Sequence, residues 1–132
     1  MNALQNFAAP LGRVLLSLIF LTSGLSKISG YAGTQSYMEA MGVPGTLLPL
    51  VIALEVLGAL VVMVGWNTRF AAFLLAGFSL LSAVLFHANF GDQMQMIMFM
   101  KNLSIAGGFL MIVSLGGGAY SLDNYLRARN GK

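Results

Sequence analysis

The sequence contains no cysteine, one histidine and only four acidic residues. Without cysteine the chain cannot form a disulfide, use a thiolate nucleophile or ligate an iron–sulfur cluster. One histidine cannot supply both axial ligands of a bis-imidazole haem, and the scattered acids do not resemble the closely spaced ligands of a zinc site. We therefore expect this chain to bind neither a metal nor a haem.

Charge of either sign is also scarce. Charged residues make up 8% of the sequence and hydrophobic residues 58%, whereas soluble domains carry about 25% charged residues. This chain has too few charges to cover a surface in water, so we predict an integral-membrane protein surrounded by a lipid bilayer. The formal net charge of +3 does not indicate nucleic-acid binding, because Lys and Arg lie at the ends of apolar runs instead of clustering on one face.

Four apolar runs are long enough to cross a bilayer, which takes about 20 residues of helix. They cover roughly residues 9–28, 46–65, 68–88 and 95–116. The pattern predicts an all-α, four-helix membrane bundle that forms a single domain over residues 1–132. Pro10 is expected in the first turn of the first helix. Shorter helices are predicted at 34–41 and after Ser121, which would cap the last one.

Four spans place both termini on one side of the membrane. That side holds most of the basic residues, Arg13, Arg69, Arg127, Arg129 and Lys132, while the opposite side has Lys27 and Lys101 accompanied by Glu39 and Asp92. The positive-inside rule therefore predicts that both termini are cytoplasmic. A signal peptide is the less favoured interpretation of the first 30 residues, because no small-x-small cleavage site follows cleanly and Lys27 interrupts the usual position.

Two ionisable residues lie well inside the predicted spans. A charge at membrane depth costs about 2.5 to 3.5 kcal/mol on insertion scales, so such groups usually face the bundle interior and mark function. Glu55 shares a helix face with Gly58 and Gly65, and Lys101 shares one with Ser104 and Gly108. We predict that Glu55 and Lys101 approach each other in the outer half of the bundle and form its catalytic pair.

Five further polar residues are predicted to bind a substrate in the same pocket: Lys27, Arg13, His87, Asn89 and Asn102. Lys27 and Arg13 are fourteen residues apart, or nearly four helical turns, so both can face the interior. Simpler interpretations remain open. Both cations could extend to lipid headgroups, His87 could be an interfacial residue, Asn102 could bond across helices, and the pair of Glu55 and Lys101 could be purely structural.

Several motifs in this order resemble the DoxX family of small bacterial four-helix inner-membrane proteins. They are Gly24-x-x-Lys27, GVPG at 42–45, ALEVLGALVVMVGWNTRFAA at 53–72, KNLSIAGGFL at 101–110 and GGGAYSLD at 116–123. The resemblance implies a multi-pass protein of the bacterial inner membrane linked to redox work, such as quinone-linked sulfur oxidation, quinone or electrophile detoxification, or oxidative-stress complexes. Lys27, Glu55 and Lys101 match the family's recurring charged positions.

A quinone or quinol site is the leading hypothesis. Lys101 and Lys27 would donate to a quinone oxygen, Glu55 would exchange a proton, and the walls would come from Phe86, Phe90, Met98 and Phe99. Electrons would come from a redox partner protein or a second bound molecule, as in an oxidoreductase subunit. The sequence leaves open whether the protein is an enzyme at all. Two alternatives are a non-catalytic membrane scaffold for redox partners and a small transporter, which would require a homodimer.

Overall fold

Six α-helices and one short 3-10 helix form the part of the chain, residues 2–130, that this computed structural model describes. The four long helices are α1 (Ala3–Ser29), α3 (Leu48–Val64), α4 (Thr68–Phe86) and α5 (Gln93–Leu115). Shorter elements are α2 (Tyr31–Ala40), η1 (Gly45–Leu47) and α6 (Leu122–Asn130). Within residues 2–130, four segments are long and apolar enough to span a membrane, one of them formed by η1 with α3. The bounds of these segments agree with those of the predicted spans to within a few residues at most ends.

The N-terminal end of α1 departs most from the prediction, because the helix begins at Ala3 and not near residue 9. Asn2 and Gln5 form a capping box, in which the Asn2 side chain accepts the Gln5 N–H at 2.9 Å. Pro10 therefore lies inside the helix, and its predicted place in the first turn was wrong. At 27 residues, α1 is about 40 Å long, which exceeds the bilayer's hydrocarbon core of about 30 Å.

The turns between helices use residues that adopt a left-handed backbone. Gly65 ends α3 with φ 83°, and Gly116 ends α5 with φ 81°. Such angles favour glycine because they crowd a Cβ atom. Gly116 begins the GGG run at 116–118. The predicted capping by Ser121 is confirmed, because its hydroxyl accepts the Asn124 N–H at 3.2 Å.

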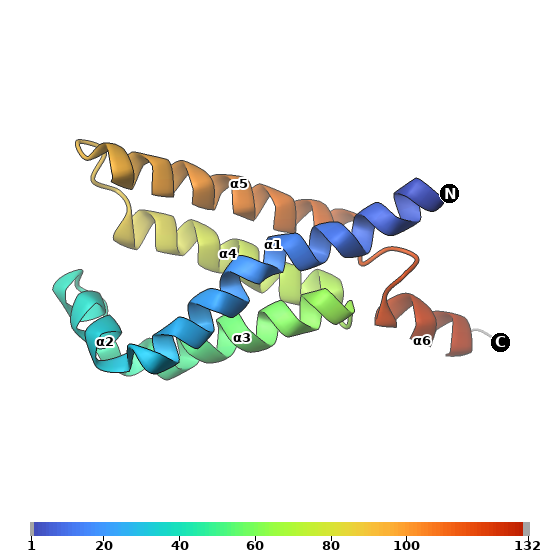
Figure 1. The fold of residues 1–132 in the computed structure, drawn as a ribbon, viewed down its shortest axis with the longest axis horizontal. Coiled ribbons are helices and arrows are strands. Elements are labelled where there is room, and N and C mark those ends of the chain that lie inside the picture. The colour runs from blue at the N-terminus through green and yellow to red at the C-terminus, as the bar shows by residue number, and fades with distance from the viewer. Residues whose placement is uncertain (1, 131–132) are drawn as a thin grey trace.

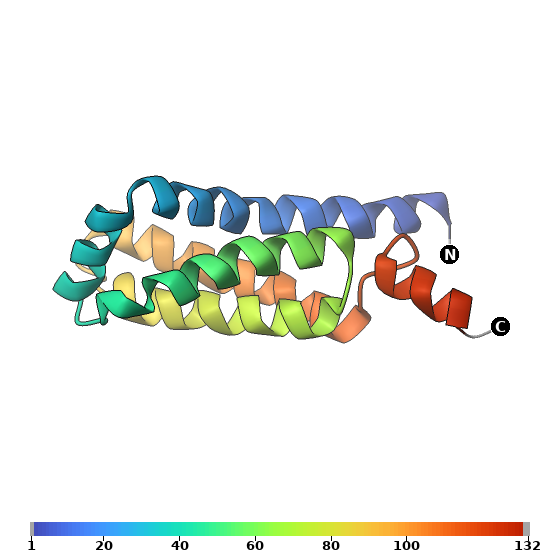
Figure 2. The same cartoon turned by 90° about the horizontal axis from the view of Figure 1, so that it is seen from below.

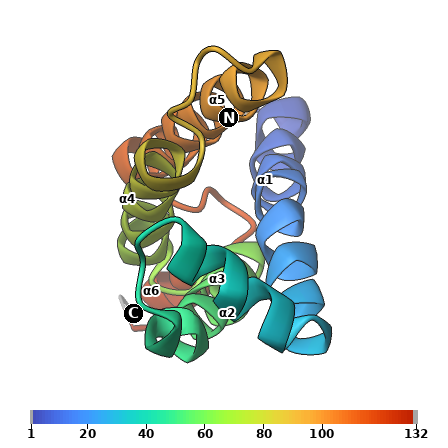
Figure 3. The same ribbon diagram turned by 90° about the vertical axis from the view of Figure 1, so that its left-hand side faces the viewer.

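The long helices form a bundle built from two pairs. α1 packs mainly against α3, and α4 packs mainly against α5; α3 and α4 join the pairs, while α1 touches α5 only sparsely. The end view in Figure 3 shows α1, α3, α4 and α5 around a central space, with α2 crossing one end. Consequently α3 and α5 lie diagonally across the bundle and not side by side.

We call the two halves of the bundle proximal and distal. The proximal half carries both described chain ends, the turn between α3 and α4, and α6, which extends beyond the bundle (Figures 1 and 2). The distal half carries α2, η1 and the loop between α4 and α5.

The core is built from small residues on α4 and aromatic residues on its neighbours. Small residues at helical spacing form a stripe along α4, and this stripe is buried at Ala72, Ala76, Ser79 and Ala83. Phe20 of α1 meets Phe109 of α5 edge to face, with ring centroids 5.5 Å apart, an arrangement that aromatic quadrupoles favour. Ser104 is exposed, so the predicted inward face of α5 was wrong there; α5 instead buries Ile105, Ala106 and Phe109.

Candidate functional site

The distal half contains a partly open cavity of about 640 Å³, lined mainly by residues of α1 to α5. Most of the lining is aliphatic or aromatic. Five titratable side chains of the described residues border it. They are Lys27 of α1, Tyr37 of α2, Glu55 of α3, Lys101 of α5, and His87, which directly follows α4. We call this space the distal cavity.

Lys27 and Glu55 form an ion pair in one wall of the distal cavity. The Lys27 ammonium donates to Glu55 Oε1 at 2.7 Å and to the Ser23 hydroxyl at 2.7 Å. The Glu55 side chain is 3% exposed, and that of Lys27 is 25% exposed. Within residues 2–130 no other hydrogen bond to the Glu55 carboxylate is found, so its second oxygen is available to a ligand.

Gly24 explains why α1 and α3 approach so closely at this point. A Cβ at residue 24 would lie 2.6 Å from a methyl carbon of Val56 and 3.2 Å from the Glu55 Cβ. The absent side chain lets α3 pack directly on α1, and Lys27 lies one turn further along the same helix. The spacing Gly24-x-x-Lys27 thus places an ammonium beside Glu55.

The predicted approach of Glu55 to Lys101 was wrong, because the partner of Glu55 is Lys27. Glu55 lies on α3 and Lys101 on α5, which are diagonal in the bundle, whereas α1 packs along α3. Both residues nevertheless border the distal cavity, and Glu55 does not face lipid, since it is 2% exposed.

Lys101 is exposed and contributes an unpaired cation to the distal cavity. Within residues 2–130 its ammonium makes no hydrogen bond and no ion pair. Asn102 is half-buried next to it and also lines the cavity.

His87 lies at the C-terminal end of α4, where it lines the cavity. Its Nδ1 is 3.2 Å from the side-chain oxygen of Gln95. In the neutral tautomer in which Nδ1 donates this hydrogen bond to Gln95, Nε2 is the acceptor. Asn89, predicted to join His87 at the rim, lies exposed in the loop and does not line the cavity.

The predicted aromatic walls are present only in part. Phe86 lines the distal cavity, as does Met98, and the Phe86 ring stacks on Tyr37 of α2 with centroids 5.6 Å apart. Phe90 and Phe99 instead pack edge to face against each other at 4.9 Å, outside the lining. Helix α2 therefore closes part of the cavity through an aromatic contact with α4.

Arg13 is not part of the distal cavity, although it is buried on the same helix as Lys27. Its guanidinium donates to the carbonyl oxygens of Val62 and Met63 at 2.9 and 2.8 Å, and also to that of Tyr120. These acceptors include carbonyls of the last turn of α3, which have no partner inside a helix. Arg13 therefore ties α1 to the end of α3 and to the C-terminal segment.

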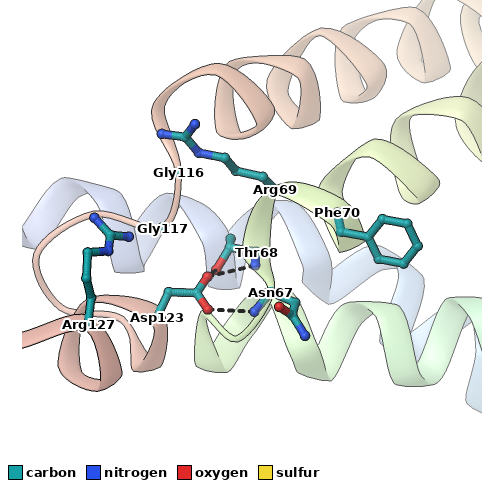
Figure 4. Close-up of a pocket in the computed structure, with 8 residues that line it drawn as sticks. All are labelled: Asn67, Thr68, Arg69, Phe70, Gly116, Gly117, Asp123 and Arg127. Carbon is teal, nitrogen blue, oxygen red and sulfur yellow. Dashed lines mark hydrogen bonds between the residues drawn. The ribbon is translucent and has the colours of Figure 1, made fainter. Parts of the chain in front are cut away.

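Asp123 holds α6 to the start of α4, as Figure 4 shows. Its carboxylate accepts the N–H groups of Asn67 and Thr68 at 2.7 and 2.8 Å and the Thr68 hydroxyl at 2.6 Å. Burial alone would raise the pKa of Asp123, but the hydrogen bonds from Thr68 and Asn67, together with the charge of Arg127, hold that pKa below its ordinary value. This contact is a helix cap supplied by a distant segment.

Sequence reasoning missed the side chains that hold the charged groups in place. Ser23 lies four residues before Lys27, so helical spacing could have identified it as a neighbour. Gln95 and Tyr37 carry no such local signal, because their partners come from other elements. Within residues 2–130 no three His, Asp or Glu side chains come together as metal ligands would.

Comparisons with known proteins agree on the kind of membrane protein. The family model DoxX matches residues 8–88. The chain is 51% identical over 129 residues to the Escherichia coli (strain K12) inner membrane protein YqjF, covering 98% of this chain and 99% of that one. It is 39% identical over 120 residues to the inner membrane protein YphA of the same strain, covering 86% of each chain.

A third similarity is more limited. The Bacillus subtilis (strain 168) protein named "Putative oxidoreductase CatD" is 33% identical over 76 residues, covering 58% of this chain and 57% of that one. No solved structure matches the chain.

Proposed function

We propose a function for this chain, which belongs to the DoxX family and is a multi-pass protein of the bacterial inner membrane. It binds a quinone or quinol, or a related small electrophile, in the distal cavity. The observation that carries this proposal is an apolar cavity of about 640 Å³ into which a buried ion pair and a separate cation both project.

The distal cavity fits a quinone in size and chemistry. Ligand sites typically measure about 300 to 1,000 Å³ and combine apolar walls with a few polar groups. A quinone ring needs such walls, and its two carbonyl oxygens need hydrogen-bond donors. Lys101 and Asn102 offer donors from α5, whereas Lys27 offers one from α1. Donors on two sides of the cavity can hold both carbonyls at once.

Glu55 is the group best placed to exchange a proton. Its Oε1 is held by Lys27, and its second oxygen is available toward the cavity. A quinol hydroxyl could donate to that oxygen, and Lys27 would stabilise the carboxylate that accepts the proton. His87, at the C-terminal end of α4, offers a second proton acceptor through Nε2 in the tautomer that carries its proton on Nδ1.

A redox role would need electrons from outside the chain. We propose that a redox partner protein or a second small molecule supplies them, so that the protein acts as an oxidoreductase subunit and not as a complete enzyme. The relative named "Putative oxidoreductase CatD" has a name in keeping with this role.

The membrane orientation that we propose places the proximal half in the cytoplasm. Arg13, Arg69, Arg127 and Arg129 lie in that half, whereas the distal half holds Lys27 and Lys101. This distribution satisfies the positive-inside rule. The distal cavity would then lie in the outer half of the membrane and exchange protons with that side.

A binding measurement with a matched control tests the proposal. Purified protein in nanodiscs is titrated with menadione while its thermal unfolding is followed; ligand at 100 times Kd stabilises by about 2.7 kcal/mol. Glu55→Gln should weaken binding of the reduced, quinol form, because an amide oxygen is a weaker hydrogen-bond acceptor than a carboxylate and cannot take up the proton. The control Glu39→Gln removes an exposed carboxylate outside the cavity and should bind like wild type. A Glu55→Gln protein that binds both forms like wild type would rule the site out.

A scaffold for redox partner proteins is the second candidate. The observation in its favour is that Lys27 and Glu55 satisfy each other within the protein at 2.7 Å, so the pair needs no ligand. In that case the pair would serve only to fix the arrangement of α1 and α3. Quinone titration would then produce no stabilisation in any variant.

A further inference from the structure

The distal cavity contains more positive than negative charge. Among residues 2–130, Glu55 contributes its only carboxylate, and that group is already neutralised by Lys27 at 2.7 Å. Lys101 adds a second ammonium, which has no partner within residues 2–130. His87 can add a further proton but not a negative charge, and Tyr37 is a phenol. In a formal count that takes His as neutral, the side chains lining the cavity therefore carry an excess of one positive charge.

The surroundings of Lys101 strengthen its attraction for a negatively charged ligand. Lys101 lies in the third turn of α5, about 12 Å from its first residue, Gln93. Most of the cavity lining around it is aliphatic or aromatic, and attraction between charges strengthens as the local dielectric constant falls. An anionic ligand atom would neutralise the ammonium, whereas a neutral ligand would leave it uncompensated.

We infer that the distal cavity prefers lipophilic ligands in their anionic form, and that Lys101 determines this preference. This inference rests on the proposed function, because it names the substrate class of the same site: an aromatic ring or quinone that carries an ionised hydroxyl or carboxyl group. The ionised oxygen is directed toward α5, because the Lys101 ammonium has no partner within residues 2–130, whereas Lys27 is already paired with Glu55. Lys27 then remains available to donate to a neutral carbonyl of the same ligand.

The basic residues of the proximal half do not form an equivalent site. The Arg13 guanidinium already donates hydrogen bonds to three backbone carbonyl oxygens. Arg69 and Arg127 line a pocket of about 400 Å³ together with the carboxylate of Asp123, but its described lining is mainly polar residues and glycine, so it suits a lipophilic ligand less than the distal cavity does. Arg69 therefore provides a matched control: replacing it by methionine removes the same charge from the protein without touching the distal cavity.

The test compares two pairs of probes that differ mainly in charge. Lawsone carries a ring hydroxyl that is ionised at neutral pH, and menadione is the neutral methyl analogue; naphthoate and naphthamide form a second pair that contains no quinone. Binding is measured in nanodiscs of zwitterionic lipid for wild type, Lys101→Met, Lys101→Arg and Arg69→Met. Lys101 is exposed, so its replacement by an apolar residue is not expected to prevent folding.

Wild type, Lys101→Arg and Arg69→Met should bind lawsone about tenfold more tightly than menadione, as a charge-assisted hydrogen bond predicts. Lys101→Met should lose that preference. Equal or tighter binding of menadione by wild type would overturn the inference while leaving quinone binding intact. A preference for anions that survives in Lys101→Met would overturn the role of Lys101.

The second probe pair separates this inference from the proposed function. If naphthoate binds more tightly than naphthamide but neither naphthoquinone binds, the anion preference holds and the quinone proposal fails. If none of the four probes binds, both fail.

Discussion

Breaking the Lys27–Glu55 ion pair should destabilise the protein unequally, depending on which partner is removed. Lys27→Met leaves Glu55, whose side chain is 3% exposed, without its only cation. An uncompensated buried charge of this kind costs about 3 to 5 kcal/mol. Glu55→Met leaves Lys27, which is 25% exposed and still bonded to Ser23 at 2.7 Å, so we expect a smaller loss of about 1 to 3 kcal/mol.

The double variant carries the more informative prediction. Met at both positions replaces the pair by apolar groups in an apolar bundle, and such replacement of a buried pair is often neutral. The double variant should therefore be more stable than Lys27→Met alone. Wild type, the two single variants and the double variant form a double-mutant cycle. The coupling free energy calculated from their unfolding free energies measures the interaction between Lys27 and Glu55.

Unfolding by SDS titration in mixed micelles, followed by circular dichroism, gives the free energies. Lys101→Met is the matched control, because it makes the same chemical change at a lysine with no partner within residues 2–130; a change of about 0.5 kcal/mol or less is expected for it. The reasoning is refuted if Lys27→Met is no more destabilising than Lys101→Met. It is also refuted if the losses of the two single variants simply add.

Two further predictions concern other contacts. Gly24→Ala should cost about 1 to 3 kcal/mol of unfolding free energy, because its Cβ would lie 2.6 Å from a methyl carbon of Val56. Gly12→Ala, where the same helix has open space, should be neutral or stabilising. Equal effects of the two substitutions in the same SDS titration would contradict the close packing at Gly24. The second prediction concerns Asp123, whose pKa is lowered in the folded protein. The stability that its ionised carboxylate gives to the folded protein is fully present above the ordinary carboxyl pKa of 3.8, and it is lost as pH falls through the lower pKa of the folded state. Thermal unfolding measured across this acidic range should show the loss in wild type, and a wild-type profile parallel to that of Asp123→Asn would contradict it.

Much of the fold follows directly from the sequence. Apolar runs of bilayer length predict transmembrane helices, because a helix is one of the few ways to satisfy backbone hydrogen bonds in lipid. Gly116 and Ser121 marked the end of one helix and the start of the next, since both act through their own neighbouring backbone. Burial of the small-residue stripe on α4 was likewise predictable from helical spacing.

Local signals also identified which polar residues were unusual, but not which would meet. Glu55, Lys27 and Lys101 were selected because a charge within a span is costly, and all three border one cavity. Periodicity gives the face of each helix on which a residue lies. It contains no information on which neighbouring helix covers that face.

The pairing of Glu55 with Lys27 was decided by the order in which the helices pack. Gly24 lets α1 approach α3 closely, and α5 lies across the bundle from α3. The same dependence on packing placed Arg13 on the carbonyls at the end of α3 and Asp123 at the start of α4. Each helix carries its own hydrogen bonds and hydrophobicity, so its existence is a local property; contacts between helices depend on the shapes of two surfaces that are distant in sequence.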